Sequence, residues 1–337
     1  MIVWDHWHIE PSSICTLKCP RCPRSELPDI LLNRQLSLNF FQNQIGESTV
    51  RQIKKITFCG NDGDPIYCRD FFEICMWLKQ TNPNIGLTII TNGSYKPAVW
   101  WQKLGQVLNH QDEIHWSIDG WDQQSNQQYR VNSNWQSIVE GIGAFTKTNQ
   151  TTYRVWATIG FRFNQAHIEH IKQLAVDMNF DCFQLTKSTK FGSKYPDAYG
   201  QQDQLEPTDS SLVSSSHRFE RKLHQLTNKP NPNQLIKKLF FERSKQLKKT
   251  NYSNICAIGN KGVFLNSQGE FYPCCWTANR YQHNQDWQGR FNLHQRSFTE
   301  IINDDFWKTE FLKFNNLECK TKCTPEKLND TQHTIEW

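Results

Sequence analysis

Over residues 1 to about 190, short apolar runs alternate with longer segments whose apolar positions recur at helical spacing. This alternation predicts β/α units with parallel strands. The expected strands are 2–10, 55–59, 86–91, 113–118, 153–163 and 181–186. The expected helices are 69–80, 97–108, 135–148 and 167–178, with Pro97 in a first turn and Asn134 as an N-cap. The predicted class is α/β, a partial (β/α)6 TIM-type barrel with its site at the carboxyl ends of the strands.

Alternation within the strands predicts a polar lumen. In the strand 113–118, His115, Ser117 and Asp119 share one face, and Trp116 and Ile118 share the other. The polar face is expected inside, because the outer face must pack against apolar helices. The same reasoning places inside the residues His6, His8, Glu10, Trp156, Thr158, Gly160, Arg162, Gln184 and Thr186. Such a lumen indicates a cavity that binds a ligand.

The composition changes after residue 190, where Gln, Ser, Asn and Lys become frequent. Helices are expected near 209–228 and 233–248, on either side of a Pro-Asn-Pro sequence. Residues 217–249 hold ten Lys or Arg and two Glu, a local charge of +8 in a chain of net charge +5. A solvated helical face accounts for this balance best, and a surface for an acidic peptide or phosphate backbone is the alternative. The predicted divisions are a barrel (1–190), a helical basic bridge (191–250) and a C-terminal domain (251–337).

Mean hydropathy is -0.70, and no apolar run approaches the roughly 20 residues that span a bilayer. No signal-peptide pattern is present, so a cytoplasmic protein without membrane contact is expected. In a reducing compartment, the 12 cysteines indicate metal ligands or buried thiols. Four scattered cysteines are interpreted as structural: Cys59, Cys68, Cys75 and Cys182.

The spacing C-x3-C-x2-C of Cys15, Cys19 and Cys22 can present three thiolates to one inorganic group. Soft sulfur ligands select iron–sulfur clusters, zinc or copper(I), and a zinc knuckle lacking its fourth ligand is an open alternative. On a four-iron cubane, three protein ligands would leave one iron open to a small molecule.

A second set of cysteines lies near the C-terminus. Two apolar runs around Asn266-Ser267-Gln268-Gly269 predict a hairpin that brings Cys256 and Cys274 together. A helix is expected near 298–314, followed by Cys319 and Cys323. These four thiolates fit either a 4Fe–4S cluster or structural zinc. The adjacent Cys275 is interpreted as a spectator.

Taken in order along the chain, these motifs resemble those of the radical S-adenosylmethionine (SAM) superfamily. Cys15, Cys19 and Cys22 match its three cluster ligands, which leave one iron to chelate the amino and carboxylate groups of SAM. The sequence Cys59-Gly60-Asn61-Asp62-Gly63-Asp64-Pro65 resembles the Gly-Gly-Glu-Pro motif that holds the SAM amino group. Other expected SAM contacts are Arg21, Gly63, Asp64, Asn92, Ser117 and Asp119. Arg21 replaces a residue that is often aromatic in the family and would stack on adenine.

The C-terminal spacing of Cys256, Gly269, Cys274, Cys319 and Cys323 resembles the twitch domain, the shortened form of the SPASM domain. This resemblance implies a small α+β domain with one auxiliary 4Fe–4S cluster bound by the four cysteines.

The resemblance implies an enzyme that reductively cleaves SAM, so that a 5'-deoxyadenosyl radical abstracts hydrogen from a substrate. The expected reaction is oxidation or cross-linking of a peptide or small molecule, with a flavodoxin- or ferredoxin-like electron donor. The alternatives are radical modification of a nucleotide or nucleic acid, and a zinc-stapled binding protein without catalysis. Catalytic candidates by lumen position are Glu10, His115, Asp119 and Arg162.

Overall fold

The computed structural model describes residues 4–26, 33–60, 62–192, 204–214, 220–234, 262–278, 289–307 and 309–313. Nine strands form one sheet in the order β7-β6-β5-β4-β3-β2-β1-β8-β9. Strands β1 to β6 are parallel and β8 is parallel to β1, whereas β7 and β9 pair antiparallel with β6 and β8. The bounds are β1 His6–Ile9, β2 Lys55–Phe58, β3 Gly86–Thr91, β4 Glu113–Ser117, β5 Tyr153–Ile159, β6 Cys182–Lys187, β7 Glu220–Gln225, β8 Val263–Leu265 and β9 Phe271–Tyr272.

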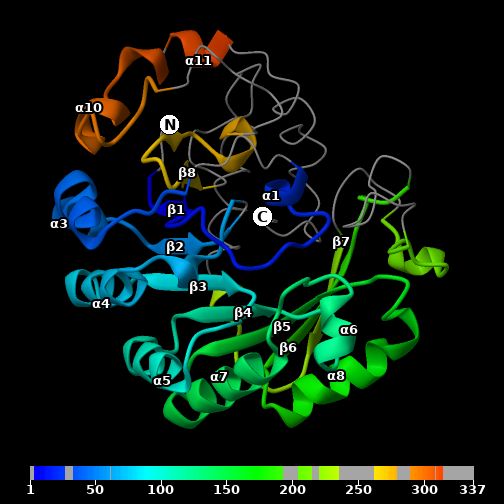
Figure 1. The fold of residues 1–337 in the computed structure, drawn as a ribbon. Coiled ribbons are helices and arrows are strands. Elements are labelled where there is room, and N and C mark those ends of the chain that lie inside the picture. Colours follow the sequence, from blue (N-terminus) through cyan, green and yellow to red (C-terminus); the bar gives the residue numbers. More distant parts are fainter. Residues whose placement is uncertain are drawn as a thin grey trace.

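Helices follow the outer side of the curved sheet, as Figure 1 shows for α4, α5, α7 and α8. Their bounds are α1 Pro23–Glu26, α2 Leu38–Phe40, α3 Glu47–Val50, α4 Phe71–Thr81, α5 Ala98–Val107, α6 Gln123–Gln127, α7 Trp135–Thr148, α8 Ile168–Asp177, α10 Phe298–Ile302 and α11 Glu310–Lys313. A π-helix, Phe41–Ile45, joins α2 to the short loop before α3. No described helix has the length and apolar character needed to cross a membrane.

The six strands and four helices predicted for the first 190 residues are all present. The Asn134 side chain caps α7 by accepting a hydrogen bond from the Ser137 amide at 2.9 Å, as predicted. Pro97 stands one residue earlier than predicted, at the N-cap of α5. The short helices α1, α2 and α3 and the π-helix were missed, because three to five residues are too few to show a helical period.

One helix prediction was wrong, and a second was confirmed in part. In the described part of 209–228, the chain forms a 3-10 turn, Ser210–Leu212, and the strand β7 in place of the predicted helix. Successive residues of β7 point to opposite faces of the sheet. Glu220 lies on the outer face, where it pairs with Lys187. Arg221 lies opposite Thr186, which faces the lumen. The segment 298–314 is divided into α10, a 3-10 turn and α11, and the predicted helix 233–248 lies almost wholly outside the described residues.

Large aromatic side chains cover the outer face of the sheet. Trp116 is fully buried between the helices, with ring centroids 5.6 Å from Trp101 and 5.5 Å from Phe145. Phe180 packs against both Trp116 and Trp156, at 5.5 and 5.3 Å. Trp156 therefore lies on the outside, which corrects its predicted place in the lumen.

The inward and outward positions of β5 are therefore the reverse of those predicted, along the whole strand. Ala157 lies opposite Ser117, and Trp156 lies opposite Trp116, so Thr158 lies outside with Trp156. Beyond the strand, Arg162 is exposed and donates from Nε to the Glu206 carbonyl at 2.8 Å. The reason is that both faces of β5 carry apolar residues, and polarity alone could not fix its phase.

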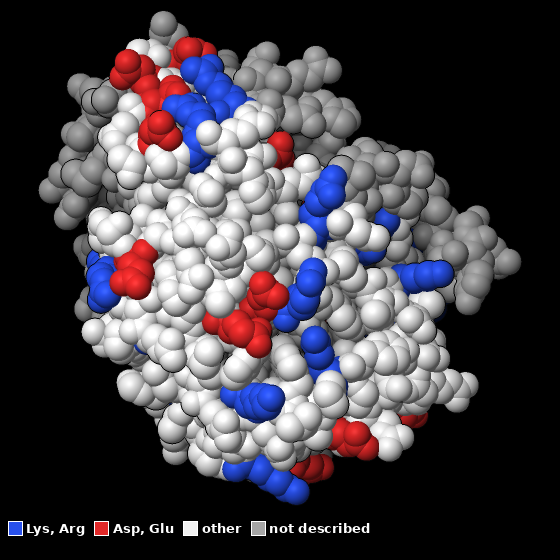
Figure 2. Space-filling model, turned by 60° about the vertical axis from the view of Figure 1, so that its left-hand side comes forward, with Lys and Arg blue, Asp and Glu red and all other residues white. Residues whose placement is uncertain are grey.

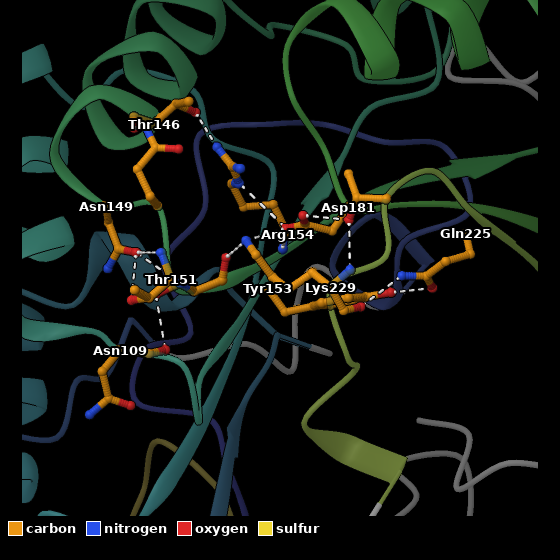
Figure 3. A network of polar contacts seen from close by, with 12 residues as sticks. Asn109, Thr146, Asn149, Thr151, Tyr153, Arg154, Asp181, Gln225 and Lys229 are labelled. Carbon is orange, nitrogen blue, oxygen red and sulfur yellow. Dashed lines mark hydrogen bonds and ion pairs between the residues drawn. The ribbon is translucent and has the colours of Figure 1, made fainter.

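A polar network fastens the segment after β7 beneath the amino ends of β5 and β6 (Figure 3). The buried Asp181 carboxylate accepts from Lys229 Nζ and from the Arg154 amide, both at 2.9 Å. Thr227 Oγ1 donates to the other carboxylate oxygen at 3.0 Å. Lys229 also donates to the Thr152 carbonyl at 3.1 Å, so one lysine connects two strand ends.

Replacing Asp181 with Asn should destabilise the protein by about 3 kcal/mol, because the amide leaves the cations of Arg154 and Lys229 uncompensated. Chemical denaturation of the full chain measures this change. The matched control is Asp177→Asn on the exposed side of α8, where a change within about 0.5 kcal/mol is expected. Equal stability of the two variants would contradict the assigned role of the network.

Candidate functional site

The three N-terminal cysteines lie in the loop that follows β1, at the carboxyl edge of the sheet. Neighbouring loops fix its backbone: the Asp64 amide donates to the Ile14 carbonyl at 2.9 Å, and the Lys18 amide donates to the Val131 carbonyl at 3.0 Å. Gly63 is required here, because a Cβ atom would lie 2.2 Å from the Ser12 carbonyl oxygen. The loop after β2 therefore packs directly on the cysteine loop.

The thiols of Cys15, Cys19 and Cys22 lie close to one another, with Cys19 buried and the other two half-buried. Burial raises the pKa of Cys15 and Cys19 to about 12 and also raises the pKa of Cys22. The charges of Cys19 and Cys22 each raise the pKa of Cys15 further, so the three thiols lie close enough to interact. The apolar residues around them are Leu17, Tyr129, Phe161 and Leu205.

Soft thiol donors of this kind bind either an iron–sulfur cluster or a single metal ion. In the described part of the chain, no three His, Cys, Asp or Glu side chains converge closely enough to hold one metal ion. On a cubane each cysteine binds a different iron, so three thiols of one loop also suit such a cluster.

Asp64 and Asn92 meet beside Cys15. Asp64 Oδ2 accepts from the Asn92 amide at 2.7 Å and from Asn92 Nδ2 at 2.6 Å, and its Oδ1 caps the turn Pro65–Tyr67. Burial raises the pKa of Asp64 to about 6, although these hydrogen bonds oppose the shift. Asn92 Nδ2 lies 3.6 Å from Cys15 Sγ. Asp64 thus orients the Asn92 amide toward the thiols.

On the other side of the thiols, Asp119 pairs with Arg130. Asp119 Oδ2 lies 2.6 Å from Arg130 Nε, and its Oδ1 accepts from the Ile159 amide at 2.7 Å. The Arg130 charge acts to lower the pKa of Cys19 and Cys22 against the effect of burial. Arg130 was not among the site residues predicted from the sequence. The one feature that could have indicated it is the position of a cation between Tyr129 and Val131.

The remaining expected SAM contacts lie at the same carboxyl edge or below it. Arg21 is buried, and its Nε donates to the Lys190 carbonyl at 3.1 Å, which connects the cysteine loop to the segment after β6. Ser117 lies on the lumen face beside Ala157. The structure therefore brings Asp64, Asn92 and Asp119 around the thiols.

The catalytic candidates are dispersed. His115 Nε2 lies 3.0 Å from Glu113 Oε2, toward the amino ends of the strands, where Asn233 also donates to Glu113. Glu10 is fully buried at the end of β1. Arg162 was wrongly placed in the lumen, for the reason given above.

At the C-terminal side, the predicted hairpin is present as β8 and β9, and β8 extends the barrel sheet beside β1. Cys274 is half-buried, with Sγ 3.9 Å from Thr277 Oγ1. Cys256, Cys319 and Cys323 lie outside the described residues, so the second ligand set stays a prediction.

No family model and no curated protein sequence matches this chain. Solved structures do match. The structure of native anSMEcpe with bound AdoMet is 17% identical, with a TM-score of 0.54 over 96% of this chain and 88% of that one. The same protein with bound AdoMet and the Cp18Cys peptide is 16% identical, with a TM-score of 0.50 over 96% and 87%. This chain therefore shares the fold of a protein that binds AdoMet, which is SAM.

Proposed function

We propose that this protein is a radical SAM enzyme. The observation that carries the proposal is the enclosed group of Cys15, Cys19 and Cys22, with the Asp64–Asn92 and Asp119–Arg130 pairs beside it. The fold shared with an AdoMet-binding protein supports this reading. When bound, a 4Fe–4S cluster would supply the electron that splits SAM.

The three thiols would hold three irons of that cluster. Leu17, Tyr129 and Phe161 would keep water from it, since they enclose the loop with apolar surface. Low polarity strengthens every charge interaction at the site. Deprotonation of the buried thiols would be coupled to binding of the cluster, because the raised pKa values disfavour free thiolates.

SAM carries an ammonium, a carboxylate, a ribose and an adenine. The Arg130 guanidinium is suited to the carboxylate, because it is a half-buried cation whose charge acts on Cys19 and Cys22 of the ligand loop. The ammonium would lie near Gly63 and Asp64, with Asp64 also orienting Asn92. Ser117 and Asp119 would lie toward the ribose and methionine parts, and Arg21 toward the adenine.

The polar lumen below this site is suited to a substrate rich in hydrogen-bonding groups, either a peptide or a small molecule. Its wall includes His6, His8, Glu10, Lys55, Thr57, Thr88, Glu113, His115, Gln184 and Thr186. The radical would abstract hydrogen there, leading to oxidation or cross-linking. A one-electron donor and an auxiliary cluster on Cys256, Cys274, Cys319 and Cys323 complete the proposal, for a cytoplasmic enzyme.

The alternatives have less support. A structural zinc site takes four ligands, and the N-terminal loop supplies three thiols. A nucleic-acid substrate would favour a continuous basic surface. Figure 2 instead shows acidic and basic groups interspersed on the face it draws. In the described part of the basic stretch, Lys229 pairs with Asp181, and Glu220 pairs with Lys187.

Replacing Cys15, Cys19 and Cys22 together with Ala should abolish iron incorporation at this site and 5'-deoxyadenosine formation from SAM and dithionite without air. Liquid chromatography of the nucleoside, together with iron analysis, measures both. Cys75→Ala in α4 is the matched control, since that cysteine is buried in the main hydrophobic core and not in the cluster around the ligand loop. Undiminished SAM cleavage by the triple variant would refute the proposal.

Arg130→Met should weaken SAM binding roughly 10- to 150-fold, the equivalent of a charge-assisted hydrogen bond of about 1.5–3 kcal/mol. Calorimetric titration of the cluster-loaded protein with SAM measures the loss. Arg130→Lys keeps a charge opposite Asp119 and should fold normally while binding with intermediate affinity. Wild-type affinity in both folded variants would exclude a carboxylate contact, and exposed Arg34→Met is the control.

A further inference from the structure

A second group of reactive side chains lies on the lumen face of β1 and β2, apart from the ligand loop. It consists of His8, Glu10 and Cys59, all buried, together with the half-buried Cys275. His8 Nε2 contacts Cys59 Sγ directly. The Cys59 amide donates to the Ile9 carbonyl at 3.3 Å, which holds the residue beside the end of β1.

The phase of β2 directs Cys59 into the lumen. Phe58 packs outward on Phe71, with ring centroids 5.1 Å apart, so Thr57 and Cys59 face the other way. Thr57 lies opposite His8 in the parallel pairing of β1 with β2. From the sequence alone, Cys59 is interpreted as structural, because a scattered free cysteine is most often a small buried hydrophobe.

Cys275 reaches the same region from the C-terminal part of the chain. It begins the 3-10 turn Cys275–Ala278, which is separated from the end of β9 by two residues, and β9 is connected to β1 through β8. The charges that act on the Cys59 thiol are those of Glu10 and Cys275, and both raise its pKa. The two cysteines, from distant parts of the sequence, thus lie close enough for their charges to interact.

The surroundings of Cys59 keep its hydrogen on sulfur. Burial raises the pKa of Cys59 well above its usual range and lowers the pKa of His8 to about 3. A neutral imidazole therefore accepts the S–H hydrogen. Metal ligands and nucleophiles need a thiolate beside a cation. A protonated thiol facing a reaction chamber is suited to a different task, since its S–H bond is weaker than most C–H bonds.

We propose that Cys59 donates a hydrogen atom to a carbon radical in the lumen, with His8 positioning the S–H bond. This inference rests on the proposed cleavage of SAM, and it replaces oxidation or cross-linking of the substrate with a redox-neutral outcome. The S–H bond of Cys59 breaks, a C–H bond forms on the substrate, and a thiyl radical is left. Cys275 passes its own S–H hydrogen to that thiyl. The one-electron donor and one proton from water then restore Cys275.

Hydrogen return has a consequence for the type of reaction. The substrate loses one hydrogen atom to the 5'-deoxyadenosyl radical and receives another from Cys59. Its oxidation state is then unchanged, as in inversion of a stereocentre or a rearrangement. The substrate class that fits is a polar molecule whose reacting carbon lies against β1 and β2, the wall that carries Cys59.

The test needs no knowledge of the substrate. Cluster-loaded full-length protein is equilibrated in D2O and given SAM and dithionite without air or any added substrate. The primary radical should then take deuterium from the S–D group, and mass spectrometry should find singly deuterated 5'-deoxyadenosine. Cys59→Ser should lose most of this label, because an O–D bond is too strong to donate. Cys75→Ala should keep it.

The outcomes separate the two proposals. If wild-type protein forms no 5'-deoxyadenosine, the proposed function fails. If 5'-deoxyadenosine forms with the same deuterium content in wild type and Cys59→Ser, or without deuterium in either, hydrogen donation by Cys59 is refuted while the proposed function stands. Cys275→Ala should keep the label in the first turnover and slow the later ones; unchanged later turnovers would remove Cys275 from the pathway.

Discussion

The structure depends on one requirement, that the outer face of the parallel sheet be covered by apolar side chains. Trp101, Trp116, Phe145, Trp156 and Phe180 meet this requirement in one continuous layer under the helices. Successive side chains of a strand point to opposite faces of the sheet. When the apolar residues of a strand face the helices, the residues between them therefore face the lumen. The polar character of the lumen is thus tied to the packing outside it. A chamber lined with His, Glu, Thr and Cys can exist because the stability of the barrel resides on the opposite face.

The same requirement explains how far the sequence could be interpreted. Strands with one apolar and one polar face, such as β4, revealed both their position and their phase. Strand β5 has apolar residues on both faces, so its position was predictable but its phase was not, and Arg162 was misplaced with it. Strand β7 was predicted as a helix. Its pairing with β6 is visible only in the folded sheet, so the sequence alone did not show that this segment is a strand.

The residues of the candidate site likewise fall into those that the sequence could predict and those that only the folded chain reveals. Cys15, Cys19, Cys22, Asp64 and Asn92 lie at the ends of successive strands, so their proximity followed from the topology. Arg130 lies beyond α6, and only the folded chain shows that it returns to pair with Asp119. The link from Cys59 to His8 was likewise invisible, since 51 residues separate them and their contact depends on strand register.

The place of β8 has a consequence for how the chain is made. Strand β1 is an interior strand of the finished sheet, with β2 on one side and β8 on the other. During synthesis, β2 emerges soon after β1, whereas β8 follows some 250 residues later. Until then one edge of β1 exposes unpaired amides and carbonyls, the kind of edge that recruits other strands. Nascent or truncated chains should therefore be prone to aggregation, and completion of the C-terminal hairpin closes that edge.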